Sequence, residues 1–400
     1  MSAARAGASS MRSTHRVEEL ARNAASAATV QRRQAKMAAA VLVCAGGLTA
    51  LGLLMVYSAS FPLALRAGNA DALQYFKKQA TALILGLIGF GLCRRVSLRT
   101  VRRWAFPLAF FSLALLALVL LLGEEVNGAR RWFDLGYVRF QPSELAKLMT
   151  VVASAAWLAE NSAARQPLRS MLPLLIGALI AAGLILAEPN LSTAALILLV
   201  LVMMFYLAGA KLRPLAGPVL LLAVVVLLAA RFIPQRWERI HCALHPESCM
   251  LSGAYQLYHS RLAVGLGGWL GRGIGESTQK YRYLPVPHTD SILAVLGEEL
   301  GFAGCAAVVL LFGGLLFAGL SIAHDAPDDF SSLLAAGATG AICLQALLNF
   351  GVTVGPLPTT GIPLPFLSYG GSSLLVTLCS LGLVMNVHAA TASQRLRWPR

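Results

Sequence analysis

The sequence predicts an all-α polytopic membrane protein with about ten transmembrane helices and a large extracytoplasmic loop between the seventh and eighth helices. Three observations predict this class. Hydrophobic residues make up 57% of the 400-residue chain and charged residues only 13%, and the mean hydropathy is +0.68. The hydrophobic residues form runs close to the roughly 20 residues that a helix needs to cross a bilayer. The Lys and Arg residues lie in short blocks between these runs, as in the loops of membrane proteins.

A polar segment precedes the first apolar run. Residues 1–36 are rich in Ala, Ser and Arg and contain no apolar core, so we expect a disordered, basic cytoplasmic tail and not a signal peptide. The membrane domain is predicted at residues 37–390, followed by a short cytoplasmic tail at 391–400. The predicted transmembrane helices are 37–60, 79–93, 104–122, 142–160, 170–187, 192–210, 215–233, 302–323, 332–354 and 371–390.

The charges of the connecting segments predict the orientation of the chain. An even number of helices places both termini in the cytoplasm, where the tails and the loops 94–103, 165–169 and 211–213 supply basic residues. The connection that follows His324 has no basic residue and disagrees with this pattern. The largest connection, residues 234–290, is predicted to be extracytoplasmic.

Composition also excludes several classes. The net charge of +15 does not indicate a nucleic-acid partner, because a nucleic-acid-binding surface needs its basic residues clustered on a soluble face. No nucleotide or haem motif occurs, so no organic cofactor is expected, and the seven cysteines show no metal-binding spacing. Cys242 and Cys249 lie in the large loop, where an oxidising compartment permits a disulfide between them as a hypothesis.

Polar residues enter the apolar runs at four places. At the first, Glu144 and Lys147 follow Pro142, which suits a first helical turn. Their spacing puts them on one helical face, where they can pair. A helix-end ion pair at the membrane surface and a functional pair inside the bundle both remain open. At the second, Glu188 and Asn190 lie beside the helix-breaking Pro189, in a predicted tight turn.

The third place, Lys280–Gly301, puts three carboxylates, Asp290, Glu298 and Glu299, beside an apolar run. Ionisable groups at membrane depth are costly and usually face a polar cavity. The fourth place is 349–373, where four prolines forbid a regular helix although the intervening residues are apolar. Such backbone is tolerated at membrane depth only when it is buried in protein or lines a cavity. A built site is therefore expected here, with an interfacial loop as the alternative.

These stretches resemble the SEDS (shape, elongation, division, sporulation) family of peptidoglycan glycosyltransferases. The resemblance runs from about Leu51 to Asn386. The motifs are NGARRW and QPSELAKL from Asn127, YQLYHS from Tyr255, STQKYRYLP from Ser277, HTDSILAVLGEELG from His288 and PLPFLSYGGSS from Pro363. The basic tail and LGLLMVYSAS from Leu51 look more like the division-type member, whereas PTTGIPLPF from Pro358 is closer to the elongation or sporulation pattern.

The resemblance implies a ten-helix enzyme that polymerises lipid II on the outer face of the bacterial cytoplasmic membrane. In this inverting transfer the acceptor 4-hydroxyl attacks the donor anomeric carbon and undecaprenyl pyrophosphate leaves. The essential acidic residue of the family corresponds to Asp290, and we therefore predict that its carboxylate is the general base. Residues predicted to bind substrate or shape the cavity by the same resemblance are Gln279, Lys280, Glu144, Lys147, Ser368, Tyr369, Gly370, Gly371 and Ser372. A divalent cation beside the pyrophosphate fits this chemistry, although no sequence motif decides it.

Two departures from the family pattern remove carboxylates, because Val286 and Asn190 stand where acidic residues are usual. They put cation binding or the level of activity in question. Two other functions stay open. Ten helices with interior charges and broken segments would also suit a lipid II flippase or transporter. Weakened catalysis would suit a scaffold that activates a class B penicillin-binding transpeptidase. The expected partners are lipid II, that transpeptidase, and other division or elongation membrane proteins, with the division site as the expected location.

Overall fold

The computed structural model describes residues 32–61, 73–126, 128–136, 138–161, 167–211, 255–355, 357–358 and 361–396, together with positions 217, 220 and 224. The helices are the N-terminal helix (Arg32–Phe61), α2 (Gln74–Arg95), α3 (Leu98–Leu122), α4 (Pro142–Glu160), α5 (Pro167–Ala187), α6 (Leu191–Leu207), α9 (Tyr255–Gly267), α10 (Gln279–Arg282), α11 (Ile292–His324), α12 (Asp329–Thr353) and α13 (Gly371–Leu396).

The helical membrane fold is confirmed. Within the described residues, 6 helices are long and apolar enough to cross a membrane, and Met171–Ala187 and Leu191–Leu207 are shorter apolar helices. Every predicted run corresponds to one of the helices above except 215–233, most of which lies outside the described residues. The count of ten therefore stays a prediction. Residues 1–31, the loop segment 234–254 and the proposed Cys242–Cys249 disulfide also lie outside the described residues.

Several boundaries differ from the predicted ones: α3 begins at Leu98 and not at 104, and α13 extends to Leu396, inside the segment predicted to be the C-terminal tail. The N-terminal helix begins at Arg32, inside the segment expected to be a tail. Helix α11 begins at Ile292, before the predicted start at 302, because the chain forms a first helical piece ahead of a break at Gly301. The predicted start at 302 corresponds to the second piece alone.

A small antiparallel sheet, which the sequence analysis did not predict, follows α3. It has the order β1-β2-β3, with β1 at Glu124–Val126, β2 at Ala129–Asp134 and β3 at Arg139–Phe140. An Asn-Gly pair separates β1 from β2, and Gly128 has a φ of +74°. Such a pair between two strands is a strong hairpin signal, because it supplies the left-handed conformation that the turn requires.

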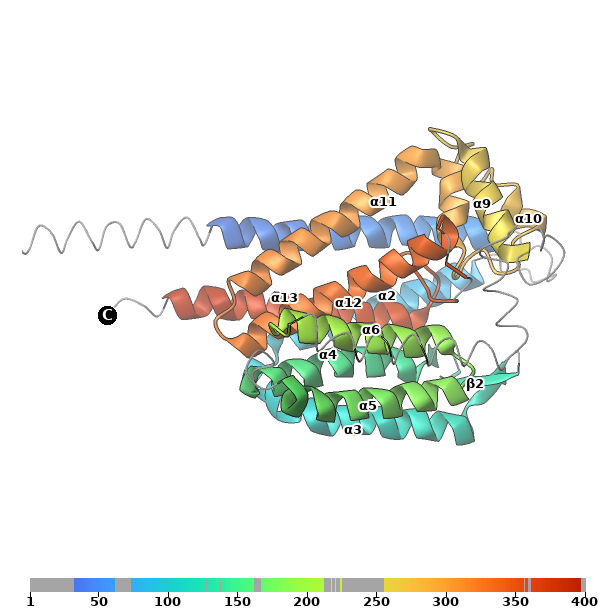
Figure 1. The fold of residues 1–400 in the computed structure, drawn as a ribbon. Coiled ribbons are helices and arrows are strands. Elements are labelled where there is room, and N and C mark those ends of the chain that lie inside the picture. Colours follow the sequence, from blue (N-terminus) through green and yellow to red (C-terminus); the bar gives the residue numbers. More distant parts are fainter. Residues whose placement is uncertain are drawn as a thin grey trace, which may run out of the picture.

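Helices α2 and α13 run in the same direction, and hydrogen bonds join them at both ends of the bundle. Near their starts, Gln79 Nε2 donates to the carbonyl O of Ser368 over 3.2 Å. Near their ends, Asn386 Nδ2 donates to the carbonyl O of Cys93 over 2.8 Å. Helices α9 and α10 and strand β2 gather at one end of the bundle, opposite the end of α13 (Figure 1). We call the end with α9 and α10 the Asp290 end and the opposite one the basic end.

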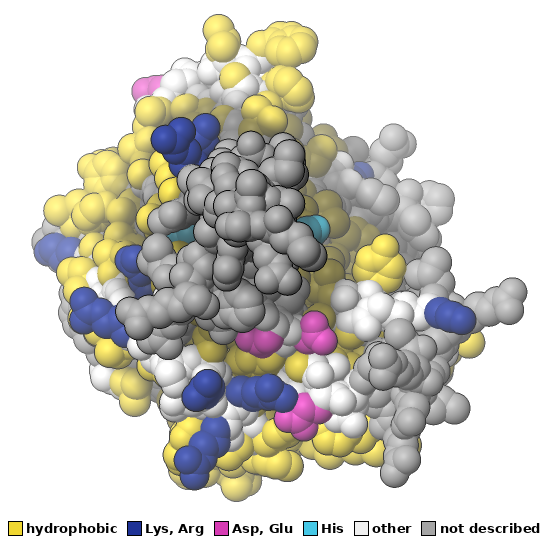
Figure 2. Space-filling view, turned by 90° about the vertical axis from the view of Figure 1, so that its left-hand side faces the viewer, with side chains coloured by type: hydrophobic (Ala, Val, Ile, Leu, Met, Phe, Trp, Pro, Cys, Tyr) yellow, Lys and Arg dark blue, Asp and Glu magenta, His cyan; other side chains and the backbone are white. Residues whose placement is uncertain are grey.

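The basic end is tied together by polar side chains. Gln34 of the N-terminal helix donates to Asp325 Oδ2, after the end of α11, and its Oε1 lies 3.3 Å from His388 Nδ1 of α13. Arg94 and Arg95 lie in the last turn of α2. Lys and Arg side chains are spread around this end (Figure 2). The pattern is typical of a cytoplasmic face. The connection predicted at 94–103 is shorter than expected, because α2 extends to Arg95 and α3 begins at Leu98.

At the Asp290 end, α11 breaks at Gly301, which has a φ of +67°. The break frees backbone groups, and the segment after α9 pairs with them. Arg272 N donates to Glu298 O over 3.0 Å, and Phe302 N donates to Gly268 O over 2.9 Å. A Cβ at Gly267 would overlap the carbonyl O of Gly297, so the close contact of α9 with α11 requires glycine there. This contact fixes the short first piece of α11, which follows Asp290.

Candidate active site

Asp290 lies in the loop between α10 and α11, directly before the N-cap residue of α11, Ser291. Its side chain is half-buried. Thr289 Oγ1 donates to Oδ1 over 2.8 Å, and Gln256 Nε2 donates to Oδ2 over 3.1 Å. A carboxylate offers about four acceptor positions. Within the described residues these two side chains fill only part of that capacity, so Asp290 can accept a further proton donor.

A small cavity lies beside Asp290, between α9 and α12. Its polar lining includes Gln256, Ser260, Ser291, Asn349 and Thr353. Gly361 of the proline-rich segment covers the carboxylate from another side. A Cβ on this glycine would lie 4.0 Å from Asp290 Oδ2, and its φ is +63°. Two helices and one irregular segment therefore enclose the carboxylate.

The SYGGSS motif joins the loop around Asp290 to the rest of the bundle. Ser368 Oγ donates to the carbonyl O of Thr289 over 2.6 Å and accepts from Leu364 N at 2.8 Å. Tyr369 N donates to the carbonyl O of His288 over 2.8 Å. Ser368 and Tyr369 thus hold the residues immediately before Asp290 in place.

The second half of the motif points to α2 and α4. Gly370 N donates to Gln79 Oε1 of α2 over 3.2 Å. Ser372 Oγ donates to the carbonyl O of Arg139 over 2.8 Å and accepts from Gln141 N at 2.9 Å, directly before α4. Gly371 lies at the start of α13, where a Cβ would make only ordinary contacts. This half therefore positions helices and lies against no atom of Asp290 that the structure records.

His288 is enclosed by aromatic rings. Its ring centroid lies 4.8 Å from that of Tyr75 and 5.4 Å from that of Tyr369. Burial lowers the pKa of His288 to about 4, although the nearby Asp290 opposes this shift. The imidazole is therefore neutral at physiological pH, and it packs in the wall beside Asp290 without competing as a charged group.

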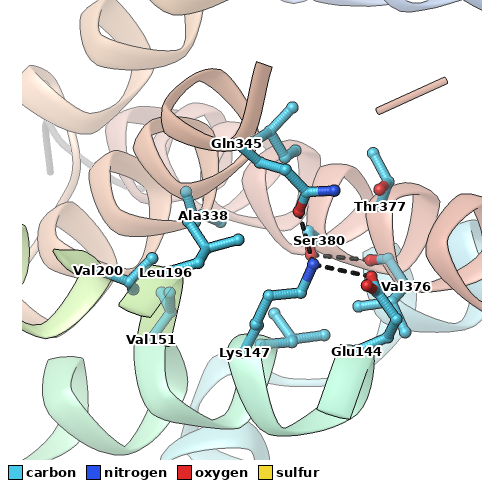
Figure 3. A pocket seen from close by; sticks show the side chains of 13 residues that line it. Glu144, Lys147, Val151, Leu196, Val200, Ala338, Gln345, Val376, Thr377 and Ser380 are labelled. Carbon is cyan, nitrogen blue, oxygen red and sulfur yellow. Dashed lines mark hydrogen bonds and ion pairs between the residues drawn. The ribbon is translucent and has the colours of Figure 1, made fainter. Parts of the chain in front are cut away.

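A second polar site lies in the middle of the bundle, at the start of α4. Lys147 Nζ lies 2.9 Å from Glu144 Oε2 and donates to Gln345 Oε1 of α12 over 2.5 Å. These three side chains meet in a pocket that α6 and α13 also line, with Thr377 and Ser380 contributing hydroxyls (Figure 3). Both Glu144 and Lys147 are buried. The sequence left open whether Glu144 and Lys147 pair at the membrane surface or inside the bundle, and the structure places the pair inside the bundle.

Helix α12 connects this central pocket to Asp290. Gln345 Nε2 donates to the carbonyl O of Pro363 over 2.8 Å. One turn further along α12, Asn349 Nδ2 donates to the carbonyl O of Ile362 over 2.8 Å and to that of Asp290 over 3.1 Å. Two side-chain amides of one helix face therefore hold both the proline-rich segment and the backbone of Asp290.

Glu298 and Glu299 in the first piece of α11 are both fully buried and fully engaged. Glu298 Oε2 accepts from Ser277 Oγ at 2.5 Å, and its Oε1 accepts from Thr278 N at 2.9 Å. Glu299 accepts from Ser58 Oγ at 2.7 Å. These contacts tie the segment before α10, and the N-terminal helix, to α11.

Lys280 and Gln279 lie within this framework. Lys280 Nζ lies 2.6 Å from Glu299 Oε1 and donates to Ser58 Oγ over 2.8 Å. Gln279 Oε1 lies 2.9 Å from His259 Nδ1 of α9. Both side chains are buried. A contact between Lys280 and a pyrophosphate therefore requires the ammonium to leave Glu299.

Glu188 differs from the other buried acids. It is 0% exposed, and neither carboxylate oxygen has a hydrogen-bond partner in the described part of the chain. Burial raises the pKa of Glu188 to about 8, with Arg131 opposing the shift. Arg131 Nε donates to the carbonyl O of Glu188 over 2.7 Å and so ties β2 to the turn between α5 and α6. The carboxyl is therefore protonated and neutral at pH 7.

Comparisons with known proteins decide the family. The family model of FtsW, RodA and SpoVE, described as "Cell cycle protein", matches residues 38–393. The chain belongs to the FtsW/RodA/SpoVE family. It is 37% identical to "Probable peptidoglycan glycosyltransferase FtsW" of Nitrosomonas europaea over 85% of this chain and 89% of the relative. It is also 38% identical to "Stage V sporulation protein E" of Bacillus subtilis, over 85% of this chain and 93% of the relative.

Solved structures of the family share this fold. One, described as "Structural coordination of polymerization and crosslinking by a peptidoglycan synthase complex", matches with a TM-score of 0.72 and 33% identity. It covers 88% of this chain and 97% of the matched chain. The crystal structure of Thermus thermophilus rod shape determining protein RodA matches with a TM-score of 0.64 and 31% identity, over 87% and 95% of the two chains. The likeness therefore spans nearly the whole membrane domain.

The two departures from the SEDS pattern have structural explanations. Asn190 is the N-cap of α6, where its side chain accepts from Thr193 N at 3.3 Å. Asn and Asp cap helices about equally well, so the missing charge leaves this cap intact. Val286 is 39% exposed, and its carbonyl O accepts from Thr289 N at 3.4 Å. The backbone contact near Asp290 is thus independent of the side chain at 286.

Three amide side chains near the sites, Gln256, Gln345 and Asn349, were not singled out from the sequence. Signals for them exist, since Gln345 and Asn349 are four residues apart on one apolar helix and Gln256 lies in a family motif. Within the described residues, no group of three or more His, Cys, Asp or Glu side chains is arranged to hold a metal ion.

Proposed function

We propose that this chain is a peptidoglycan glycosyltransferase of the FtsW type, which polymerises lipid II into glycan strands during septal wall synthesis. Its membership of the FtsW/RodA/SpoVE family and its similarity to relatives named peptidoglycan glycosyltransferases support this function. The observation that carries the mechanism is a half-buried carboxylate, Asp290, which two donors only partly saturate, beside a small cavity.

In the proposed reaction Asp290 acts as the general base. Its carboxylate takes the proton of the acceptor 4-hydroxyl while that oxygen forms a bond to the anomeric carbon of the donor. The bond from that carbon to the pyrophosphate oxygen breaks, so the configuration inverts and undecaprenyl pyrophosphate leaves with the electron pair. One carboxylate suffices, because a pyrophosphate is a good leaving group and needs no general acid.

The remaining predicted residues fall into three proposed roles. Glu144 and Lys147 line the central pocket and are proposed to contact substrate. Ser368 and Tyr369 hold the loop that carries Asp290, and Gly370, Gly371 and Ser372 are proposed to shape the cavity by positioning α2, α4 and α13 around it. Gln279 and Lys280 stay candidates for binding pyrophosphate, and for Lys280 the phosphate would have to replace Glu299 as the partner of the ammonium.

The proposed location is the bacterial cytoplasmic membrane at the division site. The basic end would face the cytoplasm and the Asp290 end the outer side, where lipid II is consumed. The matched structure of a peptidoglycan synthase complex supports a class B penicillin-binding transpeptidase as partner.

The test is lipid II polymerisation by the purified, reconstituted protein with and without a cognate transpeptidase. The parent should yield glycan strands on a gel, and Asp290→Asn should lower the rate by at least about 100-fold because a general base is lost. Asp134→Asn is the matched control, since it makes the same chemical change in a strand at the same end of the molecule. Undiminished polymer from Asp290→Asn would refute the assignment.

The same samples separate the two other functions. Translocation of labelled lipid II across vesicles that does not depend on Asp290, together with no polymer, would identify a flippase. A parent protein that stimulates its transpeptidase but forms no strands would be a scaffold. In that case Val286→Glu with Asn190→Asp should raise polymerisation if the two departures had weakened catalysis.

A further inference from the structure

The side chain of Gln256, from helix α9, contacts the carboxylate of Asp290. From α9, its Nε2 donates to Asp290 Oδ2 over 3.1 Å and lies 2.9 Å from Ser291 Oγ. The amide thus bridges the carboxylate and the N-cap residue of α11. Thr289, the other donor to this carboxylate, is the preceding residue of the same loop, so it moves together with Asp290.

The helix that carries Gln256 is fixed on three sides. Arg261 Nη2 of α9 donates to the carbonyl O of Gly355, just after α12, over 2.8 Å. His259 is bonded to Gln279 and stacks on Tyr283, with ring centroids 5.0 Å apart. The end of α9 packs on the break in α11. Gln256 therefore gives Asp290 a fixed hydrogen-bond donor that lies outside the Asp290 loop.

We propose that Gln256 is a positioning residue for Asp290. By occupying one lone pair of Oδ2, the amide fixes the rotation of the carboxylate and leaves other acceptor positions available for the proton of the acceptor hydroxyl. This role rests on the proposed function of Asp290 as general base. Asn349 acts differently. Its side-chain amide donates to the backbone carbonyl O of Asp290, which does not restrict the rotation of the carboxylate.

The chemistry of the amide suits a base. A neutral N–H donor orients a carboxylate without the strong stabilisation of the ionised form that an Arg or Lys would add. An acceptor in the same position would repel the carboxylate. Loss of the donor also makes the ionised form less favourable, so the carboxylate is protonated more easily.

The experiment compares reconstituted variants over a range of pH and lipid II concentration. Gln256→Met keeps the length and removes the donor, Gln256→Glu replaces it with an acceptor, and Gln256→His restores an N–H. We expect Gln256→Met to lower kcat about 10-fold with KM within about twofold, and to move the acidic limb of the pH profile upward by about one unit. Gln256→Glu should lower kcat further, and Gln256→His should recover most of it.

The matched control is Gln34→Met. Gln34 also donates to an aspartate, Asp325, but it lies at the basic end, and it is buried whereas Gln256 is half-buried. Its variant should therefore lose at least as much thermal stability as Gln256→Met, without the change in pH profile. If Gln256→Met fails to fold where Gln34→Met folds, the isosteric Gln256→Glu and the Gln256→His variants decide in its place.

Each outcome separates this role from the proposed function. If Asp290→Asn is inactive while the Gln256 variants keep the parent kcat and pH profile, the positioning role is wrong and the function stands. If Asp290→Asn polymerises as well as the parent, both are wrong. A uniform fall in activity for all three Gln256 variants, with an unshifted acidic limb and no recovery by His, would indicate packing alone and overturn the positioning role.

Discussion

Asp290 and Glu298 are acidic residues of the same segment, and their surroundings differ completely. Glu298 is 0% exposed and accepts from Ser277, from Thr278 and from the backbone N of Gln279. Asp290 is half-buried and accepts only from Thr289 and Gln256 among the described residues. A short stretch of chain thus holds one saturated carboxylate and one with spare acceptor capacity.

The difference supports the proposal that Asp290 performs the chemistry and that Glu298 maintains the structure of the site. Burying a charge is costly unless donors replace the lost water, and for Glu298 they do so at both oxygens. A saturated carboxylate has no position left for a substrate proton. The segment therefore uses Glu298 and Glu299 to hold its shape, and that shape presents Asp290 to the cavity.

The largest effect is expected when the saturated carboxylate is removed. Glu298→Ala leaves the buried Ser277 hydroxyl and the backbone N–H of buried Gln279 without an acceptor and removes the acceptor of Thr278, so the free energy of unfolding should fall by on the order of 5 kcal/mol. Thermal unfolding of the purified protein in detergent measures this loss. Asp290→Asn, in contrast, should keep the stability of the parent within about 1 kcal/mol.

The distinction between a structural Glu298 and a reactive Asp290 would be wrong if the two variants showed each other's effects on stability and polymerisation. A stable Glu298→Ala protein that had lost polymerisation would place Glu298 in the chemistry. A strongly destabilised Asp290→Asn protein would make Asp290 a structural residue. Glu125→Ala, on the exposed hairpin, serves as control for the Glu to Ala change.

The next effect concerns the buried pair of Lys280 and Glu299. Lys280→Met leaves the carboxylate of Glu299 buried without its cation and should cost about 3 kcal/mol of stability. The double variant with Glu299→Gln should recover most of that loss, because no unpaired charge remains. Unfolding measurements on the two single variants and the double variant give the coupling between the side chains.

Polymerisation by the double variant then sharpens the role of Lys280. If the ammonium only neutralises Glu299, the double variant should be active. A folded, stable double variant with a raised KM for lipid II would show instead that the ammonium also binds the substrate. Arg102→Met with Glu160→Gln removes an exposed pair and should change neither property.

Most of the helical fold follows from the sequence, because long apolar runs leave few alternatives in a bilayer. Gly301 shows the limit of that argument. From Ile292 to His324 the residues are apolar enough for one continuous helix, and only the segment after α9, with its glycines, explains why the helix breaks there. A contact between segments far apart in sequence leaves no periodicity signal in either of them.

The site was predicted to a similar extent. Asp290, Glu144 and Lys147 stand out because charged residues beside apolar runs are costly and therefore informative. Gln256 and Asn349 do not stand out, since an amide carries no charge and its value depends on which atoms lie opposite. The ion pair of Lys280 with Glu299 could not be predicted either, because other nearby carboxylates could equally have paired with that ammonium.

Glu188 provides a third kind of carboxylate, and its replacement is expected to change stability least near pH 5. It is buried like Glu298, yet its oxygens have no hydrogen-bond partner in the described residues. With a pKa of about 8 in the folded protein and an ordinary value of 4.5, the folded state binds more protons than the unfolded state between these pH values. Stability contributed by this carboxyl is therefore present in full below pH 4.5 and is lost as pH rises to about 8.

Glu188→Gln tests this assignment, because the amide resembles the protonated acid and cannot ionise. Near pH 5 the variant and the parent should differ in stability by less than about 1 kcal/mol. As pH rises towards 9 the parent should lose stability relative to the variant, so the difference between their unfolding temperatures grows and then levels off above the folded pKa. A difference that stays constant from pH 5 to 9 would mean that Glu188 is ionised and paired like Glu298, which would remove the distinction between partnered and unpartnered buried acids.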